Sequence, residues 1–222
     1  ITSFSTENSK HITTGDGGVV VTNNPEYATL MRKFGSLGYA VMQSNTGKIM
    51  NKDIFQDPGY KRHDTLGLNY RMPEIAAAIG LAQTERYEYF IDLRIKIAEM
   101  YHKAIENCDF IIPQKIPEGY NNTYWTFTVK YEHESISWKT FRKKFVDLGG
   151  DGIYAAWSLS YIETIMASEI YKKRAPEYFN HLTYPIGTCP IAESIQPKIM
   201  QFVTNYGTLE EAKIQTEILE KT

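Results

Sequence analysis

An unbroken run of helix-forming residues, 73–105, restricts the fold more than any other feature of this sequence. Apolar residues return along it at close to the helical repeat of about 3.6 residues. The run therefore predicts one long helix, or two helices with a kink near Glu88. The residue pattern before this run differs from the pattern after it. We therefore expect a domain boundary near Arg86, which separates residues 1–85 from residues 86–222.

Short strands and one capped helix are expected before this run. The stretches 1–5 and 19–22 are β-branched and partly apolar, which is typical of strands. The stretch 25–34 is typical of a helix, with Asn24 as its N-cap and a proline at its first position. Residues 35–68 are rich in Gly, Asn, Asp and Lys and show little periodicity, which predicts a long loop.

Strands and helices alternate after the run. The expected strands are 110–113, 124–129 and 153–157, and the expected helices are 137–148 and 208–221. This alternation predicts an α/β sandwich for the C-terminal part of the chain.

Composition argues against several classes of function. The formal net charge is −2 and the pI is about 6.3, with no basic block, which argues against a nucleic-acid-binding surface. No apolar run approaches the length of about 18 residues that a membrane helix needs, and no signal peptide opens the sequence. Cys108 and Cys189 are expected to be free thiols and the histidines are scattered, so we expect a cytoplasmic protein without a metal site.

Lys10 stands between small hydroxylated residues and a glycine-rich turn, in the stretch SFSTENSKHITTGDGG. One interpretation is a surface lysine beside a turn, although such a lysine needs no special neighbours. The other is a Schiff-base lysine, which needs an amine that partial burial can deprotonate and nearby donors for a cofactor phosphate. A nucleotide-binding Walker loop is disfavoured, because that pattern places its lysine after the glycines.

Two blocks of the sequence together resemble the DegT/DnrJ/EryC1/StrS family of sugar aminotransferases, which depend on pyridoxal 5′-phosphate (PLP). They are SFSTENSKHITTGDGGVVVTNN at 3–24 and LGLNYRMPEIAAAIGLAQ at 66–83, in the order of the family. The resemblance covers the whole chain and is closest up to Gln83. It implies an α/β fold, with the remainder of a large, aspartate aminotransferase-like PLP-binding domain over 1–85 and a smaller C-terminal α/β sandwich domain over 86–222.

The resemblance also assigns roles by position. Lys10 matches the lysine that forms the internal aldimine with PLP and then moves a proton between the substrate carbon and the cofactor. Ser5 matches a serine that hydrogen-bonds the PLP phosphate. Asn69 matches an asparagine that reaches the phosphate from the partner subunit, which implies a homodimer with a shared active site. His11 and Arg71 are further candidates, His11 for contact with substrate or cofactor and Arg71 for structural support or a charge near the phosphate.

Three regions fit the family pattern less simply. Tyr154 and Trp157 are expected to be core aromatics first and substrate-stacking groups second. Residues 39–63 look like an insertion that either lines the nucleotide-sugar entrance or forms a solvated excursion. The aromatic that stacks on PLP and the aspartate at its ring nitrogen belong to the family's N-terminal half and have no counterpart here, so the start at Ile1 fits a C-terminal fragment.

The residue at position 10 bears on the type of reaction. A related PLP-dependent sugar 3-dehydratase carries histidine where Lys10 stands, so the resemblance favours transamination. The implied reaction moves an amino group from glutamate to the keto sugar of a nucleotide sugar, in lipopolysaccharide, O-antigen or antibiotic sugar biosynthesis. Two alternatives stay open: a non-catalytic PLP-fold fragment that serves dimerisation or structure, and an aminotransferase for a non-nucleotide cyclic ketone.

Overall fold

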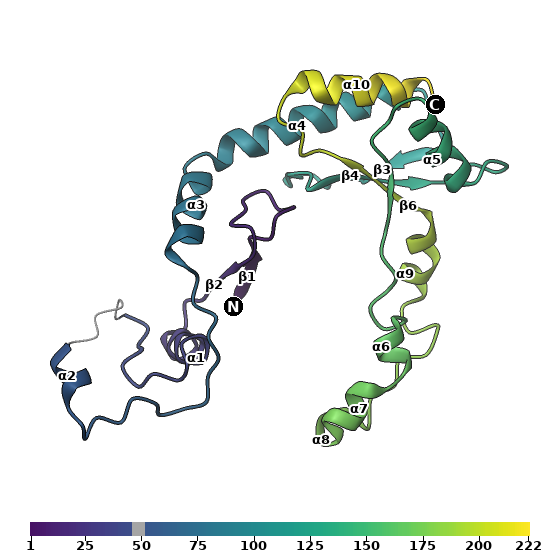
Figure 1. Ribbon diagram of the computed structural model, residues 1–222. Helices are drawn as coiled ribbons and strands as arrows, with labels where there is room; N and C mark the ends of the chain where they lie inside the picture. Colours follow the sequence, from purple (N-terminus) through teal and green to yellow (C-terminus); the bar gives the residue numbers. More distant parts are fainter. Residues whose placement is uncertain (46–51) are drawn as a thin grey trace. The chain divides into compact units, whose positions relative to one another are not determined.

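The structure, a computed structural model, describes residues 1–45 and 52–222 (Figure 1). By compactness it divides into a first unit, Ile1–Tyr87, and a second unit, Glu88–Thr222. Each unit is described by itself below. None of the helices among the described residues is long and apolar enough to cross a membrane.

The described residues of the first unit form an antiparallel pair of strands and three helices. Strand β1 (Thr2–Ser5) pairs with β2 (Gly18–Val21), and the helices are α1 (Pro25–Gly35), α2 (Lys52–Gln56) and α3 (Glu74–Thr84). Helix α1 begins where its sequence predicts, because the Asn24 side chain accepts hydrogen bonds from the N–H groups of Glu26 at 2.9 Å and Tyr27 at 3.1 Å. The segment expected to be a long loop over 35–68 contains α2 and an isolated antiparallel bridge between Tyr39 and His63.

The apolar residues of the first unit are largely uncovered. Every residue of β1 and β2 is exposed, and neither α1 nor α3 buries a side chain. The exposed large apolar side chains of the hairpin and α1 are Phe4, Val19, Val20, Val21, Tyr27, Leu30 and Phe34. Since an isolated two-stranded sheet is marginally stable in water, this unit depends on further contacts for a core.

The second unit carries the hydrophobic core. Its four-stranded antiparallel sheet has the order β3-β4-β6-β5, formed by β3 (Ile111–Pro113), β4 (Thr126–Tyr131), β5 (Tyr154–Ala155) and β6 (Ile199–Val203). Helices α4 (Tyr87–Ala104), α5 (Trp138–Asp147) and α10 (Leu209–Glu220) supply the other half of the core. Residues alternate between buried and half-buried along β4 and β6, so one face of the sheet packs against these helices.

Aromatic rings join the layers of this core. Tyr101 of α4 stacks on Phe127 of β4 with ring centroids 5.3 Å apart, and Phe145 of α5 meets Phe202 of β6 edge-on at 5.9 Å. All four side chains are almost completely buried. These contacts make the second unit a two-layer α/β sandwich, the architecture predicted from its alternating elements.

A chain of short helices connects β5 to β6. It consists of α6 (Thr164–Ala167), α7 (Ile170–Arg174), α8 (Pro176–Phe179), α9 (Pro190–Ile195) and a 3₁₀ turn (Gln196–Lys198). None of the four α-helices buries a residue. We call residues 156–198 the connecting segment.

One prediction about elements is confirmed and one needs correction. Of the two forms expected for the helix-forming run, the structure has two helices, because α3 ends at Thr84 and α4 begins at Tyr87, close to the kink expected near Glu88. The expected strand 153–157 shrinks to Tyr154–Ala155, since only these two residues pair with β6, opposite Gln201 and Met200.

Candidate functional site

The loop that carries Lys10 joins β1 to β2 and is closed at its base by hydrogen bonds. The Thr6 N–H donates to the Gly17 carbonyl at 3.0 Å, and the Thr14 N–H donates to the Thr6 carbonyl at 2.9 Å. The hydroxyl groups of Thr6 and Thr14 also lie 2.7 Å apart. Because Thr14 is buried, this threonine pair forms the inner wall of the loop.

Gly17 is required by both its backbone and its neighbours. Its φ angle is +148°, a region that side chains rarely allow. A Cβ at this position would lie 2.9 Å from Thr6 Oγ1 and 3.0 Å from Thr14 Oγ1. Gly15 also has a positive φ, of +88°, but a Cβ there would meet nothing within 4 Å. The glycine-rich turn thus packs against the threonine pair at Gly17 only.

Helix α3 supports the loop from behind. The Gln83 side-chain oxygen accepts a hydrogen bond from the Thr13 N–H at 3.4 Å. A Cβ at Gly80 would lie 3.0 Å from Thr14 Cγ2, so the helix and the loop approach closely. The two sequence blocks that carry the family resemblance are therefore in contact, through Gln83 and the lysine loop.

Lys10 itself follows a tight turn that Glu7 organises. The Glu7 carbonyl accepts the Lys10 N–H at 3.0 Å, and the Glu7 carboxylate accepts both the N–H and the hydroxyl of Ser9, at 3.0 and 2.7 Å. These bonds from Ser9, helped by the nearby positive charge of Lys10, lower the pKa of Glu7 below its ordinary value. The carboxylate therefore stays ionised beside Lys10. Sequence reasoning missed Glu7, although its spacing of two residues from Ser9 is typical of a side-chain-capped turn.

Ser5 lies at the end of β1, next to the same turn. Its hydroxyl oxygen accepts the Glu7 N–H at 3.3 Å, so the hydroxyl hydrogen can be donated to another acceptor. Glu7 thus contacts Ser5 through its N–H and Lys10 through its carbonyl. His11, the residue after the lysine, is half-buried.

Asn69 and Arg71 lie elsewhere in the first unit. Asn69 forms an antiparallel bridge with Ser36, at the C-terminal end of α1. Arg71 is exposed and lines a groove of about 1020 Å³, together with Gly17, Gly18 and residues of α1. The roles expected for both residues stay predictions.

The segment 39–63, expected as an insertion, is anchored at its ends. The Tyr39 ring stacks on His63 with centroids 4.8 Å apart, and His63 Nδ1 lies 2.7 Å from the Leu37 carbonyl oxygen. Asp64, the next residue, pairs with Lys33. Residues 46–51 of the segment lie outside the described part of the chain.

Tyr154 and Trp157 belong to the second unit, and the expectation that they are core aromatics is wrong. Tyr154 is 55% exposed, and Trp157 is 89% exposed. Ile153, the residue just before β5, is buried, and successive side chains of an extended chain point to opposite faces. Tyr154 therefore faces solvent. Trp157 follows β5, where pairing with β6 has ended. Their expected contact with substrate stays a prediction.

Comparison with known proteins places this geometry in context. The DegT/DnrJ/EryC1/StrS aminotransferase family matches residues 1–215. A curated relative, GDP-perosamine synthase from Escherichia coli O157:H7, is 35% identical over 129 residues, which are 58% of this chain and 30% of the relative.

Solved structures share the fold along nearly the whole chain. PseC from Helicobacter pylori, an aminotransferase involved in the biosynthesis of pseudoaminic acid, has a TM-score of 0.72 at 20% identity, over 99% of this chain and 52% of its own. The E. coli GDP-4-keto-6-deoxy-D-mannose-3-dehydratase with bound hydrated PLP has a TM-score of 0.66 at 20% identity, over 98% of this chain and 53% of its own. The chain thus spans about half the length of these structures.

Proposed function

Since the chain belongs to the DegT/DnrJ/EryC1/StrS aminotransferase family, we propose that the whole protein is a PLP-dependent aminotransferase that moves an amino group from glutamate to the keto sugar of a nucleotide sugar. The name of the curated relative, GDP-perosamine synthase, supports a nucleotide-linked sugar as acceptor. The setting we propose is lipopolysaccharide or related deoxyamino sugar biosynthesis. The cytoplasm is the proposed compartment, because Cys108 and Cys189 are both free thiols.

One observation carries this proposal: a lysine, not a histidine, occupies a hydrogen-bonded turn beside a serine hydroxyl. The Glu7–Ser9 bonds fix the turn before Lys10, and the closed base of the loop fixes the turn after it. These bonds fix the backbone on both sides of Lys10, so the lysine side chain starts from one defined position, which favours the repeated proton transfers of general acid–base catalysis. A solvated lysine would need neither set of bonds.

The residues of the lysine loop fit PLP by the chemistry of their donors. The amine of Lys10 suits the aldehyde end of the cofactor, and the Ser5 hydroxyl, whose oxygen already accepts the Glu7 N–H, suits a phosphate oxygen. When bound, PLP supplies an electron sink for the substrate carbon. Lys10 Nζ then holds and moves the proton at that carbon, while Ser5 orients the phosphate end.

A homodimer completes the proposed site. We assign Asn69 to the phosphate of the partner subunit, because its block is the second half of the family pattern. In this chain Asn69 is tied to Ser36 at the end of α1, which gives its backbone a fixed position. The uncovered apolar residues of the first unit are consistent with a unit that is completed by other chain segments.

Two alternatives to this proposal differ from it in what the experiment below would detect. The first unit buries no apolar side chain among its described residues, which favours a fragment that cannot hold the cofactor alone. An acceptor that is a cyclic ketone without a nucleotide would use the same Lys10 chemistry.

An amino-transfer assay of the whole protein distinguishes these possibilities. Isotope-labelled glutamate is supplied with either a nucleotide-linked keto sugar or a free cyclic ketone, and the labelled amine is found by mass spectrometry. We expect label in the nucleotide sugar, none with Lys10→Ala, and full activity with Lys139→Ala, which changes an exposed lysine of α5. Label in the cyclic ketone alone would replace the proposed acceptor, and no label from a folded dimer would contradict the enzyme proposal.

A further inference from the structure

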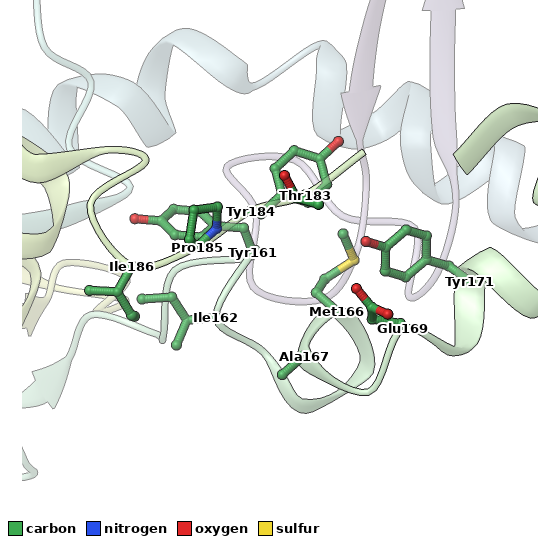
Figure 2. A pocket seen from close by; sticks show the side chains of 10 residues that line it. All are labelled: Tyr161, Ile162, Met166, Ala167, Glu169, Tyr171, Thr183, Tyr184, Pro185 and Ile186. Carbon is green, nitrogen blue, oxygen red and sulfur yellow. The ribbon is translucent and has the colours of Figure 1, made fainter. Parts of the chain in front are cut away.

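The connecting segment of the second unit lines an open pocket that the proposed function does not use. Its volume is about 490 Å³, within the range of about 300–1,000 Å³ that small-molecule sites occupy. Figure 2 shows the side chains around it. They are Tyr161, Ile162, Met166, Ala167, Glu169, Tyr171, Thr183, Tyr184, Pro185 and Ile186.

One wall of the pocket is held by Glu193 of α9. The Tyr161 hydroxyl donates a hydrogen bond to the Glu193 carboxylate, which also accepts the N–H groups of Gly187 at 2.8 Å and Cys189 at 3.3 Å. Burial, together with the bond to Glu193 and its charge, raises the pKa of Tyr161 to about 12, so the hydroxyl stays protonated. The Tyr161 ring and the 185–189 turn are therefore fixed to the same carboxylate.

The opposite wall is held by contacts within α7 and α8. Tyr171 packs edge-on against Phe179, with ring centroids 5.6 Å apart and an angle of 80° between the planes. Glu169 has a φ angle of +55° and pairs with Lys172 at 2.5 Å. In Figure 2 the side chains of Met166, Glu169 and Tyr171 lie together at one end of the pocket. Both walls are thus held by contacts within the connecting segment.

The lining restricts the kind of molecule that fits. No lysine or arginine is among the lining residues, and the one lining carboxylate, that of Glu169, is paired with Lys172, so the pocket offers little net charge to an ionic ligand. Three tyrosine rings offer flat apolar faces with hydroxyl groups at their edges. The Glu169 carboxylate can accept hydrogen bonds from hydroxyl groups of a ligand, and the Thr183 hydroxyl can both donate and accept them.

We infer that this pocket binds a neutral sugar ring. The C–H face of the sugar packs on a tyrosine ring, and its hydroxyl groups bond to Glu169, Thr183 and the tyrosine hydroxyls. The sugar comes either from a nucleotide sugar or from a free saccharide, and both present the same chemistry. The inference goes beyond amino transfer, because it depends on no step at Lys10.

Saturation-transfer NMR on the whole protein tests the inference with three probes: methyl α-D-glucopyranoside, UDP-glucose and UDP. We expect saturation to reach the sugar protons of the first two probes. The pocket variants below should reduce that transfer without changing any transfer to UDP, which the proposed nucleotide-sugar site at Lys10 can also produce. Glu169→Gln keeps the shape of the pocket and Tyr171→Ala removes one wall. Each should weaken sugar binding about tenfold, the effect of losing one hydrogen bond to a charged group or one ring contact.

Tyr178→Ala is the matched control, because Tyr178 is an exposed tyrosine of α8 that does not line the pocket. It should bind like the unchanged protein, and the circular dichroism of all variants should match. Transfer to UDP-glucose but not to the free glycoside identifies a nucleotide sugar as the source, and transfer to both identifies a free saccharide as sufficient. Equal binding in Glu169→Gln and Tyr178→Ala, or transfer to the uridine protons alone, overturns the inference. If PLP does not bind at Lys10, the proposed aminotransferase activity is refuted, whereas the sugar-binding result for this pocket does not change.

Discussion

The substitution Gly17→Ala should open the lysine loop, whereas Gly15→Ala should disturb it much less. Both glycines have positive φ angles, +148° and +88°, so each alanine strains the backbone. At Gly17 the new methyl group must also displace the hydroxyls of Thr6 and Thr14, which would lie 2.9 and 3.0 Å away. At Gly15 it would enter open space.

The expected magnitudes follow from these contacts. Backbone strain at Gly17 costs about 1–3 kcal/mol, and loss of the Thr6–Thr14 hydrogen bond costs about 1 kcal/mol more. Gly15→Ala carries only the strain of a left-handed residue, about 1–2 kcal/mol. Because about 1.4 kcal/mol is a factor of ten in an equilibrium constant, Gly17→Ala should open the loop roughly ten times more often than Gly15→Ala.

Hydrogen exchange measured by mass spectrometry reports this opening directly. The amides of Thr6 and Thr14, which donate across the base of the loop, should lose about tenfold more protection in Gly17→Ala than in Gly15→Ala. Peptides of the second-unit core serve as the internal reference and should not change. Equal loss of protection in the two variants would refute the claim that close packing, and not φ alone, requires glycine at position 17.

Two other predictions concern the turn before the lysine and the core of the second unit. The pKa of Glu7 is lowered, so the stabilisation from its Ser9 bonds is present above about pH 4.5 and is lost as the pH falls through the lowered pKa. Hydrogen exchange at the Ser9 amide should therefore rise below the lowered pKa. This pH dependence should vanish in Glu7→Gln. A pH dependence that survives Glu7→Gln would assign it to another group. Phe145→Ala removes a side chain that is 0% exposed and should lower the free energy of unfolding by about 3–5 kcal/mol. Phe179→Ala, in the connecting segment, should lower it much less, because Phe179 is exposed. Equal losses in chemical denaturation would contradict the placement of the core in the second unit.

The sequence predicted best those features that neighbouring residues determine. Asn24, Ser137 and Thr208 all cap the helices they were expected to cap or begin, because an N-cap bond joins a side chain to a backbone amide two or three residues later. The Lys10 turn was recognised from its glycines and hydroxyl residues for the same reason. Glu7 was missed because a carboxylate in a polar loop has many equivalent uses until its partner is seen.

Features that depend on distant residues were predicted less well. Strand β6 lies at Ile199–Val203, between β4 and β5, and its pairing partners are remote in sequence. Its sequence follows a proline-containing 3₁₀ turn and is too short to show a clear period. The break between α3 and α4 was placed near Glu88 because helix propensity continues through Glu85 and Arg86, and nothing local marks the end of α3.

The exposure of Trp157 illustrates the same limit. An aromatic residue after an apolar stretch is usually buried, yet here pairing with β6 stops at Ala155 and leaves the ring in solvent. Burial is a property of the whole fold, and two residues of missing strand are enough to reverse it.

The most direct test of the central claim is to trap PLP on the protein and find the lysine that carries it. The whole protein is incubated with PLP, reduced with borohydride, digested and mapped by mass spectrometry, with the other lysines of the chain as internal references. We predict that the pyridoxyl group is concentrated on Lys10 and that the other lysines carry it only at a low background level. Lys10→Ala should lose the visible absorption band. Labelling of Lys10 at the same level as exposed lysines such as Lys61 would contradict the claim that this loop holds the cofactor.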